Sequence, residues 1–123
     1  MQPRRRPGWA DARAYYARAL AECGRLEEGE RVCRETIDQQ EAGETDVVVM
    51  QLEPHRQLGL IEARLGRTEE AARRLDQLLS TYADRGPVTV GGLHQARAWI
   101  ALEARDKSAF EYHARVMREL FRS

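Results

Sequence analysis

Three histidines are the residues of this sequence best suited to bind a metal ion or to move a proton. They are His55, His94 and His113, and the first two stand 39 residues apart. A zinc site needs about three or four protein ligands, and neither His55 nor His94 has an evident carboxylate partner. We therefore expect these histidines to pack or to contact a partner, and a metal site shared by His55 and His94 is the less favoured alternative.

The two cysteines, Cys23 and Cys33, are too few for a disulfide framework or a cysteine zinc site. Both fall on apolar faces of predicted helices, so we expect both to be small buried hydrophobes. The sequence contains no Gly-rich phosphate loop, no nucleophile elbow and no His-Glu-x-x-His segment. We expect no enzymatic activity, no cofactor and no bound metal.

The charges of the chain cancel, because 20 Lys and Arg residues face 20 Asp and Glu residues in a length of 123. A neutral chain has no long-range field that attracts nucleic acid or an anionic membrane. No stretch approaches the roughly 20 apolar residues of a membrane span, and no apolar segment of a secretory signal follows the charged amino terminus. We expect a cytoplasmic protein that binds neither nucleic acid nor membrane, with a flexible basic arm over residues 1–8.

Apolar residues recur at steps of three and four through most of the chain, which is the spacing of one helix face. The clearest case is Ala71, Leu75, Leu78 and Tyr82. The pattern predicts helices over residues 9–23, 26–40, 54–65, 69–83 and 88–104, and a sixth from about residue 107 to the end of the chain. The β-like residues 47–50 have no second strand to pair with, so we expect a connector or an extra first turn of the third helix.

Local residues set the predicted helix ends. Pro54 suits the first position of the third helix, and Thr68 suits the N-cap of the fourth. Asp106 or Ser108 is expected to cap the sixth. Gly29 is expected where two helices approach closely.

The turns at residues 23–29, 65–71 and 104–110 align with one another, and the first two match closely. The middle pair of helices has Leu58-Gly59, Leu65-Gly66, Ala71, Leu75 and Leu78, and in this it resembles the tetratricopeptide repeat, whose period is about 34 residues. The resemblance covers residues 10–120. It implies an all-α fold over residues 9–123, a right-handed solenoid of three antiparallel helical hairpins with six helices.

The resemblance also implies a function, because helical solenoids present a concave face formed by the first helix of each hairpin. We expect a non-enzymatic interaction or scaffold module that binds a peptide or protein segment in this groove, as part of a larger regulatory protein or alone. The residues expected to bind the partner are Arg18, Glu22, Arg56, Leu60, Arg64, Gln95 and Trp99. Asp11, Ala14, Glu53 and Glu103 are expected on the same face.

Three alternatives stay open at this point. Arg64 and Glu22 could pair with neighbouring side chains, and Trp99 could be a core residue. The chain could instead be a self-associating homodimer that uses Leu120, Phe121 and residues 47–50. A metal-binding or small-molecule enzyme of the helical-bundle type is the weakest alternative.

Overall fold

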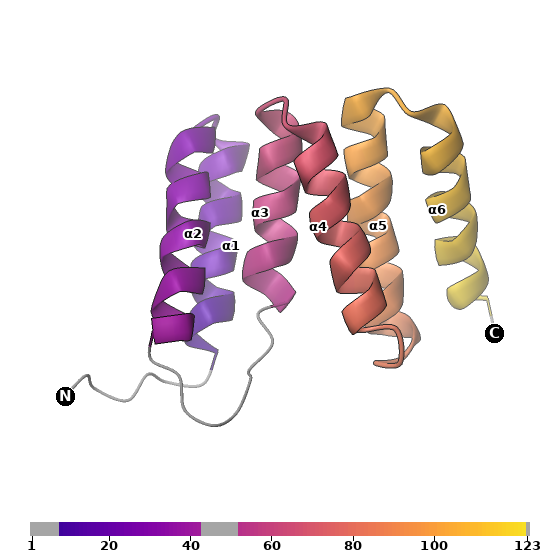
Figure 1. The fold of residues 1–123 in the computed structure, drawn as a ribbon, viewed down its shortest axis with the longest axis horizontal. Helices are drawn as coiled ribbons and strands as arrows, with labels where there is room; N and C mark the ends of the chain where they lie inside the picture. Colours follow the sequence, from indigo (N-terminus) through magenta and orange to yellow (C-terminus); the bar gives the residue numbers. More distant parts are fainter. Residues whose placement is uncertain (1–7, 43–51, 123) are drawn as a thin grey trace.

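The computed structural model describes residues 8–42 and 52–122, and within these ranges the chain forms six α-helices and no β-strand (Figure 1). The predicted all-α fold class is confirmed at this level. Most of the predicted arm over residues 1–8, and the segment 47–50, lie outside the described residues. The helices are α1 Trp9–Glu22, α2 Leu26–Ala42, α3 Leu52–Arg64, α4 Thr68–Thr81, α5 Pro87–Ala104 and α6 Lys107–Leu120.

Three helix starts differ from the prediction. Helix α5 begins at Pro87, one residue before the predicted residue 88. Helix α3 begins at Leu52, two residues before Pro54. A proline in the first turn loses no intrahelical hydrogen bond, because the first four N–H groups have no partner within the helix. At α4 the N-cap is Arg67 without a side-chain cap, so the prediction of Thr68 as N-cap was wrong. The predicted cap of α6 is confirmed, since the Asp106 side chain accepts a backbone hydrogen bond in the first turn.

The turns that follow α1, α3 and α5 share one geometry. Gly24 and Gly66 have left-handed φ angles of 84° and 94°, and Arg105 takes the same place with a φ of 57°. In each turn the next N–H bonds a carbonyl five residues back, as in a Schellman motif. These bonds run from Arg25 to Leu20, from Arg67 to Glu62 and from Asp106 to Ala101, each with an N···O distance of 2.9 Å.

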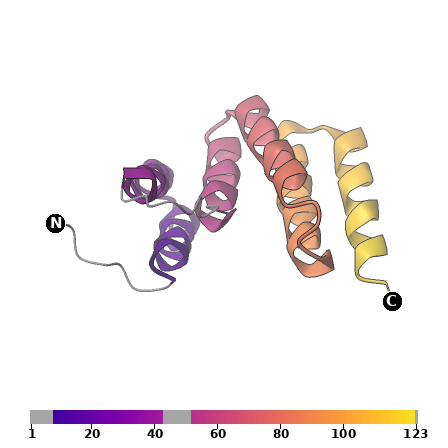
Figure 2. The same cartoon turned by 60° about the horizontal axis from the view of Figure 1, so that its bottom comes forward.

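The helices pack in consecutive pairs, α1 with α2, α3 with α4, and α5 with α6. Helix α3 also packs against α1 and α2, and α5 packs against α3 and α4. Among the described residues, every contact between helices joins elements at most two places apart in the chain. The pairs therefore stand in a row, with α1 and α2 at one end and α5 and α6 at the other (Figures 1 and 2).

Two apolar clusters lie between the pairs. The first joins α1 and α2 to Leu58 and Ile61 of α3 and contains Cys33, whose thiol pKa is raised by burial to about 12. Cys23 is exposed at the end of α1, so the prediction that both cysteines are buried was wrong for Cys23. The second cluster joins α3 and α4 to α5. Its buried members are Ala63, Ala71, Leu75, Leu78, Tyr82, Leu93, Ala96 and Ile100.

Gly29 lies where α2 approaches α1 closely, as predicted. A Cβ atom at this position would lie 2.8 Å from the backbone oxygen of Ala17 and 3.1 Å from Cδ1 of Ile61. The first of these contacts is with backbone, which cannot rotate away. A residue with a side chain at position 29 would therefore force the two helices apart.

Candidate functional site

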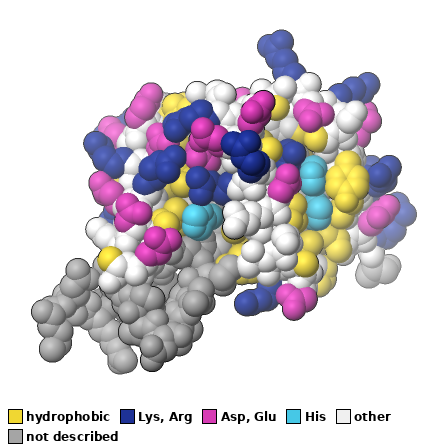
Figure 3. Space-filling model, in the orientation of Figure 1, with side chains coloured by type: hydrophobic (Ala, Val, Ile, Leu, Met, Phe, Trp, Pro, Cys, Tyr) yellow, Lys and Arg dark blue, Asp and Glu magenta, His cyan; other side chains and the backbone are white. Residues whose placement is uncertain are grey.

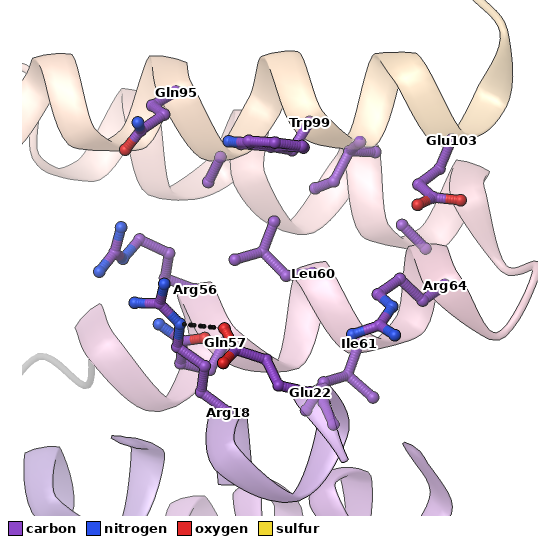
Figure 4. Close-up of a pocket in the computed structure, with 14 residues that line it drawn as sticks. Arg18, Glu22, Arg56, Gln57, Leu60, Ile61, Arg64, Gln95, Trp99 and Glu103 are labelled. Atoms are coloured by element: carbon purple, nitrogen blue, oxygen red, sulfur yellow. Dashed lines mark hydrogen bonds and ion pairs between the residues drawn. The ribbon is translucent and has the colours of Figure 1, made fainter. Parts of the chain in front are cut away.

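A groove of about 460 Å³ lies along α1, α3 and α5 (Figure 4). Its lining includes all seven residues that the sequence predicted for partner binding, and it also includes Glu103. These residues come from three helices that are separated in the chain but adjacent in space. The remaining lining residues are Ala21, Gln57, Ile61, Ala63, Ala96 and Ile100.

Three other residues expected on this face do not line the groove. Ala14 is fully buried in the core, and Asp11 is exposed outside the groove. Glu53 lies at the start of α3 and pairs with Arg56, with an N···O distance of 2.9 Å.

The floor of the groove is apolar. Ile61 and Ile100 are 2% and 0% exposed, whereas Trp99 is 56% exposed, so Trp99 is not a core residue. Figure 4 shows the Leu60 side chain directed across the groove toward the Trp99 ring. An indole and a leucine that face each other over an apolar floor can enclose a small apolar side chain of a partner.

The three arginines of the groove differ in their ion-pair partners. Arg18 donates to Glu22 at 3.1 Å within one exposed helix face. Arg56 is held by its pair with Glu53, and both of those side chains are largely buried. Arg64 is exposed and makes no ion pair with any other residue in the described ranges. The predicted alternative of pairing between neighbours therefore holds for Glu22 but not for Arg64.

A second charged site lies on the face of the molecule over α2, α3 and α4, where acidic and basic side chains interleave (Figure 3). Its centre is Glu62, which is 0% exposed. The carboxylate of Glu62 accepts bonds of 2.8 and 3.0 Å from Arg74 and one of 3.1 Å from Arg34. This buried carboxylate was not predicted from the sequence, because its two arginine partners lie on other helices.

His55 belongs to the same cluster. Its Nδ1 lies 2.8 Å from Nη1 of Arg74. Burial and, secondly, the charge of Arg74 lower the pKa of His55. Since the guanidinium only donates, Nδ1 of His55 accepts, and the ring is held neutral.

His94 and His113 form a separate pair between α5 and α6, with their Nδ1 atoms 2.9 Å apart. His55 and His94 therefore have different partners and do not share a metal site. No group of three or more His, Cys, Asp or Glu side chains in the described part of the chain is arranged to hold a metal ion. None of the six described helices combines the length and the apolar character that a membrane span requires.

The groove presents several kinds of side chain together. Its lining offers an apolar floor, an exposed indole, one unpaired guanidinium and two hydrogen-bonding amides. No family model, no curated protein and no solved structure matches this chain.

Proposed function

We propose that this chain is a non-enzymatic interaction module that binds a peptide or an extended protein segment in the groove along α1, α3 and α5. The observation that carries the proposal is the convergence of seven predicted residues from three helices on one groove of about 460 Å³. A groove of this size accommodates several side chains of a peptide. The proposal keeps the cytoplasmic location expected from the sequence.

The proposal includes the architecture, a right-handed solenoid of three antiparallel helical hairpins similar to tetratricopeptide repeats. The repeated turn geometry supports it, as does the repeated packing of each pair on the next. A repeated contact supports it further. His55 and Arg74 meet between α3 and α4, and His94 and His113, each 39 residues later, meet between α5 and α6.

The groove favours a partner that combines an apolar side chain with a hydrogen-bonding backbone. Trp99 and Leu60 supply the apolar contact, because an exposed indole gains more from burial than a side chain already packed in the core. The amide of Gln95 can bond an extended backbone. Arg64 is the groove arginine that no described carboxylate neutralises, and it supplies a charge-assisted bond.

A displayed library of random peptides, selected on the full chain, tests the proposal. The emission of Trp99 in a Trp9→Phe background reports binding, since a ligand that covers an exposed indole shifts its emission to the blue. We expect Arg64→Ala to weaken the selected peptides by about tenfold, which corresponds to about 1.4 kcal/mol. We also expect Trp99→Ala to abolish binding at the same peptide concentrations, as measured by calorimetry, since this variant lacks the reporting indole.

Arg73→Ala is the matched control, because Arg73 is an exposed arginine on α4 outside the groove. It should leave the affinity unchanged. Peptides that bind equally well to wild type, Arg56→Ala and Arg64→Ala would remove the groove from the function. A library that yields no binder would have the same meaning.

A further inference from the structure

The row of helix pairs has two ends that no described residue covers. Within the chain, the first helix of each later pair packs against both helices of the pair before it, α3 on α1 and α2, and α5 on α3 and α4. Among the described residues nothing packs in this way on α5 and α6, and nothing packs on the outer side of α1 (Figure 2). We call these surfaces the α1 edge and the α5–α6 edge.

The α1 edge repeats a surface that is buried elsewhere in the chain. Gly24 and Gly66 occupy equivalent turns 42 residues apart. The first apolar cluster is covered by three residues of the α3 segment, Leu58, Ile61 and Leu65. By the 42-residue spacing, their equivalents are Tyr16, Ala19 and Cys23. Leu58 and Ile61 are 1% and 2% exposed, whereas Tyr16 is 55% exposed and Ala19 and Cys23 are also exposed. The α1 edge is therefore an interface surface without its neighbour.

The α5–α6 edge repeats the opposite half of that interface. Arg105 and Gly24 occupy equivalent turns 81 residues apart. The α3 side chains pack on Ala17, Ala21 and Cys33 in the first apolar cluster. By the 81-residue spacing, the equivalents of these residues are Ala98, Leu102 and Ala114, which are also apolar. Leu102, the equivalent of Ala21, is 49% exposed.

Charges match in the same register. Between the first and second pairs, Arg67 donates to Glu30 at 2.8 Å. The equivalents of these two residues are Arg25, beside the α1 edge, and Glu111, beside the α5–α6 edge. Both equivalents are exposed in the single chain and are bonded within their own helical turns, Arg25 to Glu28 and Glu111 to Lys107. Two chains placed end to end would bring Arg25 of one chain to Glu111 of the other.

We propose that the α1 edge of one copy of this chain packs against the α5–α6 edge of a second copy, continuing the contact that joins neighbouring helix pairs. The two surfaces differ, so the association is head-to-tail, and a dimer leaves one free edge of each kind. Such contacts build open-ended chains or closed rings. The inference does not rest on peptide binding, because Tyr16, Leu102, Arg25 and Glu111 lie outside the groove lining.

Sedimentation velocity of the full chain from about micromolar to about millimolar concentration tests the inference. We expect wild type to form dimers and larger species as concentration rises. Tyr16→Glu removes the α1 edge alone and Leu102→Glu removes the α5–α6 edge alone, and each should be monomeric by itself. An equimolar mixture of the two should form a one-to-one dimer, because each variant keeps the edge that the other lacks.

The control is Tyr112→Glu, which is the same kind of change at a 50% exposed aromatic on α6. The equivalent positions on α4 and α2 are Arg73 and Arg31. Both arginines are exposed, although another helix pair packs against the pair to which each belongs. Position 112 therefore lies away from the contact between pairs, and this variant should associate like wild type. Circular dichroism checks that each variant is folded.

Charge reversal gives an independent measurement. Arg25→Glu and Glu111→Arg should each weaken self-association, and their mixture should recover it, because contacts between the two variants alternate between the reversed pair and the original pair. Wild type that stays monomeric up to about millimolar concentration would overturn the inference. So would a mixture of Tyr16→Glu and Leu102→Glu that stays monomeric. Association that survives both edge variants and is lost in Phe121→Asp would place the contact at the chain end and would also overturn it.

Discussion

Nδ1 of His113 lies 2.9 Å from Nδ1 of His94, so one ring donates a hydrogen bond that the other accepts. An Nδ1 that accepts must be unprotonated, and the pair is therefore incompatible with two charged rings. Burial, then the charges of Arg97 and His94, lower the pKa of His113 to about 4. Burial also lowers the pKa of His94, although the charge of Asp76 opposes this.

The first prediction is a loss of stability in mild acid. The folded chain holds its histidines neutral, whereas in the unfolded chain they bind protons below their ordinary pKa of 6.5. The free energy of unfolding should be highest above this value and should fall as the pH drops toward 4, by at most about 1.4 kcal/mol per pH unit for each histidine. Urea unfolding between pH 7 and pH 5 measures the slope.

His113→Gln should flatten this dependence without removing it, because His55 and His94 still titrate. Glu30 does not contribute to the slope between pH 7 and pH 5, since its hydrogen bond with Arg67 holds its pKa below 4.5. A slope that is identical in wild type and His113→Gln would show that the histidine pair does not control it.

The second prediction concerns the buried carboxylate. Glu62→Ala leaves Arg34 and Arg74 without the charge that both contact. Removing one partner of a buried ion pair costs about 3–5 kcal/mol, so this variant should be close to unfolded at room temperature. Glu103→Ala, at an exposed carboxylate of α5 with no ion pair among the described residues, should change stability by less than about 0.5 kcal/mol. Equal effects of the two changes would contradict the role given to Glu62.

The third prediction compares two glycines within helices. Gly29→Ala places a Cβ 2.8 Å from the backbone oxygen of Ala17 and should cost about 1–3 kcal/mol. Gly92→Ala meets no atom within 4 Å and should stabilise α5 by about 0.5–1 kcal/mol, because alanine loses less backbone entropy in a helix. Thermal unfolding of both variants measures the two changes in stability, which should have opposite signs. A gain in stability from Gly29→Ala would refute the close approach of the two helices.

The fourth prediction concerns the third turn. Arg105 has a φ of 57°, in the region that glycine occupies at the first two turns. A left-handed conformation costs a residue with a side chain about 1–2 kcal/mol, so Arg105→Gly should stabilise the chain by about 1 kcal/mol. Gly66→Ala should lose a similar amount for the same reason. If Arg105→Gly destabilises, the Arg105 side chain makes a contact that outweighs the backbone strain.

The sequence predicted the helices well because their signals are local. Periodic apolar residues and the glycines at positions 24 and 66 placed five of the six helix starts within one residue of those observed. Pro54 and Thr68 misled the prediction by one or two residues, because proline and threonine are tolerated through the first turn and not at one position alone. Helix ends differed by up to three residues.

The groove residues could be named because the resemblance to tetratricopeptide repeats implies that the first helix of each pair contributes to one shared face. The Glu62 cluster could not be predicted, since its partners come from α2 and α4 and no local pattern links positions 34, 62 and 74. Cys23 was misplaced for a related reason. It falls on an apolar face of α1, but that face lies at the uncovered edge of the row.

Because every helix meets elements at most two places away in the chain, no contact within residues 8–42 and 52–122 ties the two ends of the row together. Losing α6 costs the interface with α5 and leaves the first apolar cluster untouched. The molecule can therefore fray stepwise from its termini, with amide protons in α3 exchanging last and those in α6 exchanging early. Short-range contacts of this kind also imply rapid folding, because little chain entropy is lost before each new contact forms.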